Sequence, residues 1–102
     1  MERRDENLET LVRRLGVMLP VLRQEFPLKA MAVFGSVARG ESTPESDLDI
    51  LVDVDPSIGL GFVTLAERLE KDLGRKVDLV SRRSLRASLL KQIEPELVHV
   101  EA

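Results

Sequence analysis

Apolar residues recur at helical spacing in two parts of the chain. The first stripe predicts a helix from about residue 5, which Pro20 is expected to kink or end, because proline removes a backbone donor and clashes with the preceding turn. The second stripe predicts a helix that stops at Gly74, a residue suited to a left-handed helix end. The stripes consist of Leu8, Leu11, Val12, Leu15, Met18, Leu19 and Leu22, and of Phe62, Leu65, Ala66, Leu69 and Leu73.

Shorter apolar segments have the length and pattern of strands. These predicted strands are residues 29–34 (KAMAVF), 48–54 (LDILVDV) and 76–81 (KVDLVS). A short edge strand is expected over residues 97–100 (LVHV).

The segments between these elements are predicted to be turns and one further helix. Residues 35–46 are expected to be loop with one helical turn over 36–39, and residues 56–61 a turn. Ser84 is expected to cap a helix that runs to about Ile93. The order of elements predicts an α/β fold, a small mixed β-sheet covered by helices, in a single domain over residues 1–102.

The composition is that of a soluble globular domain, with 43% apolar and 32% charged residues. No apolar stretch approaches the roughly 18 residues of a membrane span, and the charged start of the chain is not followed by a signal-peptide pattern. We therefore expect a cytoplasmic protein with no membrane contact. The chain has no cysteine, which excludes disulfides and thiolate metal sites. Its net charge of −3 and scarce aromatic residues argue against nucleic acid as a partner.

Two aspartates, Asp47 and Asp49, flank one leucine at the head of the predicted strand 48–54. Side chains alternate along a strand, so both carboxylates point the same way, with Cα atoms roughly 6.6–6.8 Å apart. Two ionised carboxylates this close repel each other, and a divalent cation removes that cost. Hard oxygen ligands suit Mg²⁺ or Mn²⁺. Taken alone, the pattern is more typical of a solvent-facing strand edge.

Gly35 and Ser36 directly follow the predicted strand 29–34. A glycine there lets the chain turn sharply and lets a phosphate approach the backbone, and the amides and the serine hydroxyl can donate to phosphate oxygens. Gly-Ser alone fits a plain strand-to-loop turn equally well. Followed after ten residues by Asp-x-Asp, the spacing recurs by chance about once per 10³ chains of this length.

Asp78 lies between Val77 and Leu79 on the predicted strand 76–81. If that strand pairs with strand 48–54, neighbouring strands about 4.8 Å apart bring its carboxylate to Asp47 and Asp49. Three carboxylates can hold two metal ions that clamp the attacking and leaving oxygens of an in-line displacement. Asp78 could also accept the proton of the attacking hydroxyl. The alternative is a surface aspartate on an edge strand.

With these motifs, the chain resembles the minimal nucleotidyltransferases of the DNA polymerase β-like superfamily. The matching stretches are GSVARGESTPESDLDILVDVD, residues 35–55, and VDLV, residues 77–80, about half the chain. The resemblance implies that the nucleoside triphosphate is held by Gly35 and Ser36. It implies that Asp47, Asp49 and Asp78 are the catalytic carboxylates and bind the metals. Arg39 and Ser46 match frequent family positions near the nucleotide: Arg39 would pair with phosphate or an acidic neighbour, and Ser46 would fix the turn into the strand.

The resemblance also implies an activity and a partner. Short members of this family are typically encoded beside a helical HEPN-domain protein and act as its antitoxin. They transfer AMP from ATP onto a tyrosine of the HEPN ribonuclease, with two Mg²⁺ ions or with Mn²⁺ in their place. We therefore expect a protein adenylyltransferase that forms a hetero-oligomer with a HEPN protein.

Two other functions remain open from the residues alone. The chain could be a non-catalytic subunit that binds nucleotide or occludes its partner, or it could modify an RNA end. The arginines after strand 76–81, which are Arg82, Arg83 and Arg86, fit a solvated helix start better than a phosphate or partner site. The single histidine, His99, gives no functional signal.

Overall fold

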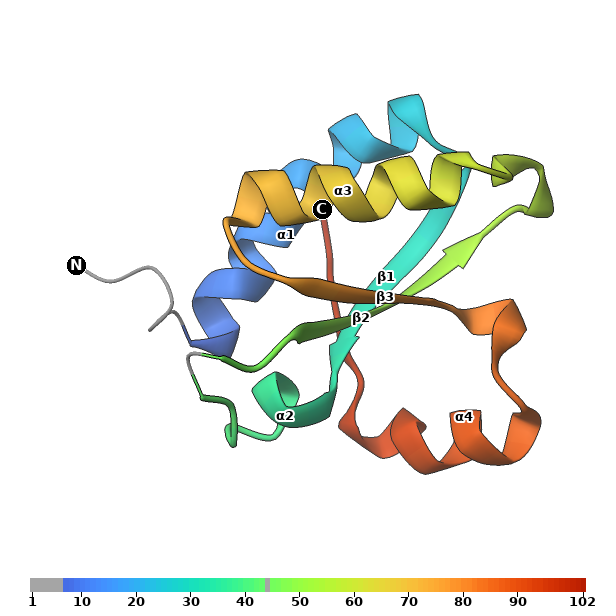
Figure 1. Cartoon of the computed structure of the whole chain (residues 1–102). Helices are drawn as coiled ribbons and strands as arrows, with labels where there is room; N and C mark the ends of the chain where they lie inside the picture. Colours follow the sequence, from blue (N-terminus) through green and yellow to red (C-terminus); the bar gives the residue numbers. More distant parts are fainter. Residues whose placement is uncertain (1–6, 44) are drawn as a thin grey trace.

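The computed structural model describes residues 7–43 and 45–102, which form a sheet with helices on both sides (Figure 1). The strands are β1 (Leu28–Phe34), β2 (Leu48–Val54), β3 (Val77–Ser81) and β4 (Val98–His99). The helices are α1 (Leu8–Glu25), α2 (Gly35–Ala38), α3 (Gly61–Leu73) and α4 (Ala87–Ile93), and the 3₁₀ turns are η2 (Pro56–Ile58), η3 (Arg82–Ser84) and η4 (Glu94–Glu96). The predicted strands 29–34, 48–54 and 76–81 are all present, and no boundary is shifted by more than one residue.

The strands follow the order β3–β2–β1–β4 across the sheet. β2 is parallel to β3 and antiparallel to β1, and β4 is antiparallel to β1. The sheet is therefore mixed, as predicted. The expected edge strand is confirmed as β4, which pairs with β1 only at Ala32 and Val33. The register of β1 against β2 shifts between Leu28 and Ala30, which marks a β-bulge.

The hydrophobic core lies between one face of the sheet and helices α1 and α3, which run over that face (Figure 1). Side chains alternate along β2, so every second residue enters the core. Burying one such aliphatic side chain contributes about 1.5–3 kcal/mol. The buried positions are Leu48, Ile50, Val52 and Val54 of β2, Leu11, Leu15, Leu19 and Leu22 of α1, and Leu65, Leu69 and Leu73 of α3.

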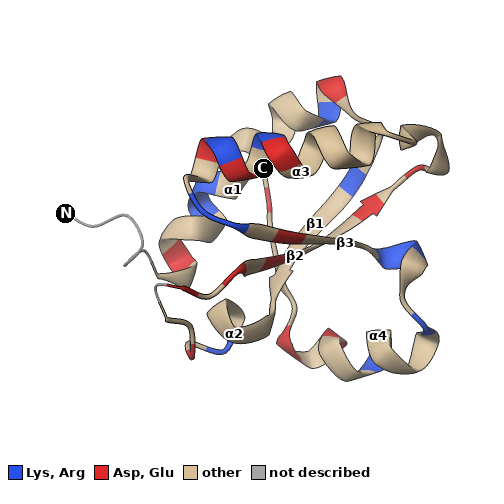
Figure 2. Cartoon of the chain, in the orientation of Figure 1, with Lys and Arg blue, Asp and Glu red and all other residues tan. Residues whose placement is uncertain are grey.

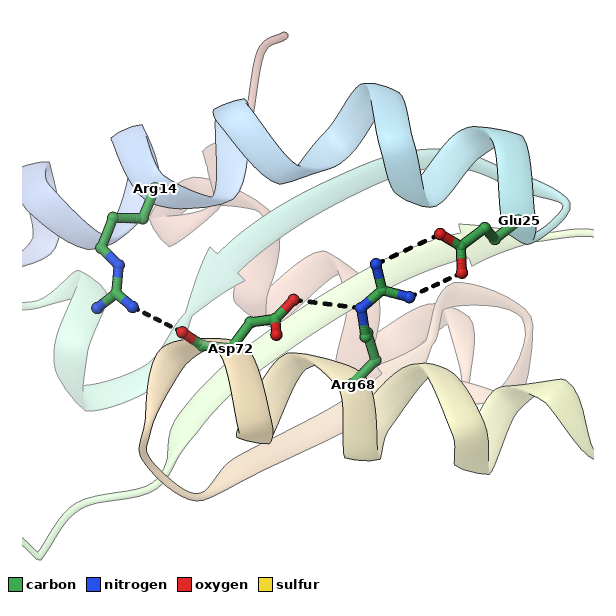
Figure 3. A network of polar contacts seen from close by, with 4 residues as sticks. All are labelled: Arg14, Glu25, Arg68 and Asp72. Carbon is green, nitrogen blue, oxygen red and sulfur yellow. Dashed lines mark hydrogen bonds and ion pairs between the residues drawn. The ribbon is translucent and has the colours of Figure 1, made fainter.

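A polar network joins the facing edges of α1 and α3 (Figure 3). Arg68 of α3 donates to both carboxylate oxygens of Glu25 at 2.7 and 3.3 Å, and to Asp72 at 3.2 Å. Arg14 of α1 donates to the backbone carbonyl of Asp72 at 2.7 Å. The hydrogen bond from Arg68 lowers the pKa of Glu25. Because these side chains are partly exposed, the network contributes little to the free energy of folding.

Pro20 was expected to kink or end the first helix, and of these two alternatives an end at Pro20 is wrong. The helix continues to Glu25, with Pro20 exposed inside it. Leu19 and Leu22 lie on either side of the proline and are both buried, so core packing holds the helix together across the missing hydrogen bond. Although α1 has 18 residues, no helix within residues 7–43 and 45–102 is both long and apolar enough to cross a membrane.

The predicted helix ends were right at Gly74 and wrong at Ser84. Gly74 has φ 68° and ψ 31°, the left-handed conformation expected of it, and its N–H bonds to the carbonyl of Glu70. Ser84 lies in η3, where its hydroxyl donates to the carbonyl of Ser81 at 2.8 Å. Because that local bond engages the hydroxyl, Ser84 does not cap α4, which begins only at Ala87 and has no side-chain cap.

Candidate active site

Asp49 of β2 and Asp78 of β3 are register partners in the parallel pair of strands. Their neighbours Leu48, Ile50 and Val77 enter the core, so alternation places both carboxylates on the opposite face of the sheet. Figure 2 shows the acidic segments of these two strands side by side near the middle of the sheet. The predicted convergence of Asp49 and Asp78 is confirmed.

The pKa of Asp49 is raised from 3.8 to about 6. Burial is the largest cause, because removing water disfavours the charged carboxylate. The charge of Asp78, a hydrogen bond with it and the charge of Asp47 act in the same direction, and Arg39 opposes them. The site therefore concentrates negative charge that a proton or a cation can relieve.

Asp47 lies in the loop just before β2 and is exposed. It is close enough for its charge to raise the pKa of Asp49. However, no three carboxylate, histidine or cysteine side chains among the described residues are arranged as a ready-made metal site. The structure thus provides a pair of carboxylates with Asp47 at its rim, and the three-ligand, two-metal site stays a prediction.

Gly35 turns the chain sharply at the end of β1. It is buried and has φ +78°, a conformation that residues with a side chain rarely adopt. A Cβ atom built there would overlap the carboxylate of Asp49 and lie 2.9 Å from its Cγ. The glycine is therefore required twice, for its backbone conformation and for the space that Asp49 occupies. Ser36 follows it in α2 and is half-buried.

Arg39 lies just past α2 and contacts two glutamates. Its Nη1 donates to Oε2 of Glu96 at 2.9 Å, and its Nε donates to Oε1 of Glu41 at 3.0 Å. The hydrogen bonds that Arg39 donates to Glu41, and then to Glu96, raise the pKa of Arg39. The other oxygen of Glu96 accepts the backbone N–H of Gly35 at 3.3 Å. Sequence patterns did not single out Glu96, because its approach depends on how β4 pairs with β1.

Ser46 organises the loop that leads into β2. Its hydroxyl accepts the N–H of Thr43 at 2.9 Å, and its carbonyl accepts a hydrogen bond from Arg75 at 3.0 Å. This agrees with the expected role of fixing the turn before Asp47. Nε of Arg75 is buried without a hydrogen-bond partner in the described part of the chain. The Arg75 contact was not foreseen, since its partner is a backbone carbonyl.

The other candidate residues do not join this site. Arg82 and Arg83 follow the far end of β3 from Asp78, and Arg82 forms an ion pair with Glu94 at 3.6 Å. Arg83 lines a separate cavity of about 360 Å³, which lies between η2, the start of α3 and the end of β3. His99 is exposed in β4.

Comparisons with known proteins agree with the fold. Residues 17–99 match the nucleotidyltransferase domain family. The protein adenylyltransferase MntA of Thermococcus cleftensis is 46% identical over 81 residues, which cover 78% of this chain and 81% of that protein.

Solved structures agree as well. One, described as a candidate minimal nucleotidyltransferase, superposes with a TM-score of 0.78 at 38% identity and covers 92% of this chain and 96% of its own. A chain from the complex of the tri-AMPylated Shewanella oneidensis HEPN toxin with its MNT antitoxin has a TM-score of 0.65 at 26% identity, covering 88% of this chain and 71% of its own. These similarities confirm the fold expected from the sequence.

Proposed function

The chain belongs to the nucleotidyltransferase domain family, and from this we propose that it transfers AMP from ATP to a hydroxyl of a partner protein. The observation that carries the proposal is the pairing of Asp49 with Asp78 beside the Gly35 turn. The name of the Thermococcus relative supports AMP as the transferred group and protein as the acceptor.

The reaction is an in-line displacement at the α-phosphorus of ATP. The acceptor oxygen attacks that phosphorus, the bond to the oxygen bridging the β-phosphate breaks, and pyrophosphate leaves. Asp78, exposed on the sheet surface, accepts the proton of the attacking hydroxyl. The Gly35 amide, the Ser36 hydroxyl and Arg39 hold phosphate oxygens, with charge-assisted hydrogen bonds from the guanidinium. Ser46 fixes the loop that carries Asp47.

Asp47, Asp49 and Asp78 would hold Mg²⁺, as two ions, with Mn²⁺ as an alternative. The residues fit such a group, because the Asp49–Asp78 pair and the raised pKa of Asp49 describe the charge that a divalent cation neutralises. When bound, the metal supplies charge neutralisation and alignment of the triphosphate.

We propose a HEPN-domain protein as the partner, with a tyrosine hydroxyl as the acceptor. In the Shewanella complex, an MNT antitoxin is bound to a HEPN toxin that carries AMP groups. The similarity of this chain to that complex supports the same arrangement here. The chain would act as the antitoxin of a cytoplasmic pair by modifying its partner.

The test is transfer of radiolabel from [α-³²P]ATP to the HEPN partner in the presence of Mg²⁺. Asp49→Asn should lower the rate on the order of 10²-fold or more, since it removes a charge that acts in the transition state. Asp53→Asn is the matched control, because Asp53 is also half-buried on β2 and shares the face of Asp49. Asp49 pairs with Asp78 of β3, whereas the β2–β3 register ends at Val52, so Asp53 has no acidic register partner there. It should label the partner like the wild type.

Equal labelling by the wild type and Asp49→Asn would contradict catalysis at this site. If Asp49→Asn loses labelling but still neutralises the toxin, the chain acts by occlusion, and the antitoxin part of the proposal fails. Label on RNA rather than on protein would show that the acceptor is wrong.

A further inference from the structure

Glu96 occupies two of the donors that the proposed function assigns to the triphosphate. Its Oε1 accepts the backbone N–H of Gly35 at 3.3 Å, and its Oε2 accepts Nη1 of Arg39 at 2.9 Å. The side chain is 23% exposed, against 46% for Arg39, so it lies between the turn and the guanidinium rather than in open solvent. A carboxylate thus binds where phosphate oxygens are expected.

The sheet brings Glu96 to this position. β4 pairs antiparallel with β1, with His99 opposite Ala32 and Val98 opposite Val33. Continuing this register by two residues sets Glu96 opposite Gly35. The pairing of the last strand therefore brings the backbone of Glu96, at the end of η4, close to the Gly35 turn, and its side chain completes the contact.

We infer that Glu96 is an internal competitor of the triphosphate and sets the affinity of the chain for ATP. The inference rests on the proposed function, which gives the Gly35 amide and Arg39 to the nucleotide. Two anions that accept from the same N–H and the same guanidinium repel each other, so nucleotide binding requires Glu96 to withdraw. Part of the binding free energy is then spent on breaking its contacts.

Glu41 and Glu94 supply comparisons within the chain. Glu41 also pairs with Arg39, through Nε, and its side chain is 65% exposed. Glu94 lies in η4 with Glu96, but its ion-pair partner is Arg82 at 3.6 Å. Changing Glu41 or Glu94 to glutamine removes the same formal charge as Glu96→Gln does. Glu41→Gln measures the effect of removing one ion pair of Arg39 while Glu96 stays in place. Glu94→Gln measures the effect of removing one negative charge from η4 without changing the contacts of Arg39.

Isothermal titration of the full chain with Mg²⁺–ATP and with inorganic tripolyphosphate tests the inference. Glu96→Gln should bind both ligands about three- to tenfold more tightly than the wild type, the scale expected for freeing a partly buried charged pair. The KM for ATP should fall by a similar factor with kcat unchanged. Glu94→Gln should bind like the wild type, and Glu41→Gln should gain less than Glu96→Gln.

A second variant and a second measurement distinguish the loss of the Glu96 contacts from misfolding of the variant. Glu96→Asp keeps the charge on a shorter side chain and should bind with intermediate affinity. In ¹H–¹⁵N spectra, the Gly35 amide resonance should move in Glu96→Gln without ligand, and in the wild type when tripolyphosphate is added. A Gly35 resonance that stays fixed in both cases would overturn the inference.

The binding results separate this inference from the proposed function. Tighter tripolyphosphate binding by Glu96→Gln without AMP transfer to any protein supports the competitor role and refutes the proposed reaction. Normal transfer with equal or weaker ATP binding by Glu96→Gln leaves the reaction standing and overturns the competitor role. If neither the wild type nor Glu96→Gln binds tripolyphosphate or ATP, the competitor role is overturned as well.

Discussion

At Asp49, burial and the neighbouring carboxylates both raise the pKa of the side chain. Burial first, then the charge of Asp78 and that of Asp47, raises its pKa from 3.8 to about 6. A carboxyl group with a higher pKa in the folded state binds protons more tightly there than in the unfolded chain. It therefore contributes stability below about pH 4, and this contribution is lost as the pH rises towards 6.

Asp49→Asn should remove this pH dependence. Between pH 4 and 6 the free energy of unfolding of the wild type should fall relative to that of the variant, because only the wild type loses a proton there. At pH 7.5 the variant should be more stable by on the order of 1 kcal/mol, or several degrees in Tm, since solvent screens this half-exposed group. Thermal unfolding across this pH range measures the difference.

The same variant tests whether the site attracts a cation. Mg²⁺ should raise the Tm of the wild type at pH 7.5 and have little effect on Asp49→Asn. Asp53→Asn should follow the wild type in both experiments. A constant stability difference between Asp49→Asn and the wild type at all pH values would show that Asp49 has an ordinary pKa.

Gly35→Ala should cost more stability than Gly40→Ala. Both glycines have positive φ, +78° and +73°, so alanine at either site meets the same backbone penalty of about 1–2 kcal/mol. At Gly40 a Cβ would meet nothing within 4 Å, whereas at Gly35 it would overlap the carboxylate of Asp49. We expect an additional loss of about 1–3 kcal/mol at Gly35, measured by urea unfolding. Equal losses would mean that Asp49 moves aside freely.

Much of the site could be read from the sequence, because its residues belong to local patterns. Asp49 and Asp78 each lie within an alternating strand, and pairing of those strands was the remaining assumption. Glu96 could not be found in this way, since it reaches Gly35 only through the register of the two-residue strand β4. Asp47 was predicted to share the strand face of Asp49, but the strand begins at Leu48 and leaves it in the loop.

At the scale of elements, α1 shows core packing overriding a local rule. Proline in a helix interior costs about 3 kcal/mol or more. Burying the leucines on each side of Pro20 contributes about 1.5–3 kcal/mol for each, which is enough to offset that cost. The sequence alone does not reveal this balance, because it depends on what the helix packs against.

Pro20→Ala should therefore stabilise the protein. Alanine restores the N–H that can bond to the carbonyl of Gly16 and favours the helix, and Pro20 is exposed, so no core contact is lost. We expect the free energy of unfolding to rise by about 1–3 kcal/mol. Part of this gain is offset, because the proline also stabilises the protein by restricting the unfolded chain. Gln24→Ala, at another exposed position of α1, should change stability by less than about 0.5 kcal/mol. A loss of stability in Pro20→Ala, measured by urea unfolding, would mean that the proline is needed in this helix.

At the scale of the whole molecule, the order and type of the main elements were predictable and their ends were less so. The strands and the two long helices have strong periodicity, and their burial in one core agrees with it. α4 has no buried residue, and its predicted start at Ser84 was wrong. Elements that depend little on the core carry a weak sequence signal, because few of their positions are constrained by packing.

The short β4 has a consequence for how copies of the chain meet. It covers β1 only at Ala32 and Val33, so the stretch around Lys29 has no strand of the described chain on that side. An unpaired strand edge exposes backbone N–H and C=O groups that can pair with another polypeptide and start aggregation. In this chain the β-bulge bends the edge of β1, and the exposed Lys29 places a charge on it. Arg23 also donates a hydrogen bond to the backbone carbonyl of Lys29 at 2.8 Å. These three features protect the exposed edge of β1 from aggregation, although β4 pairs with only two of its residues.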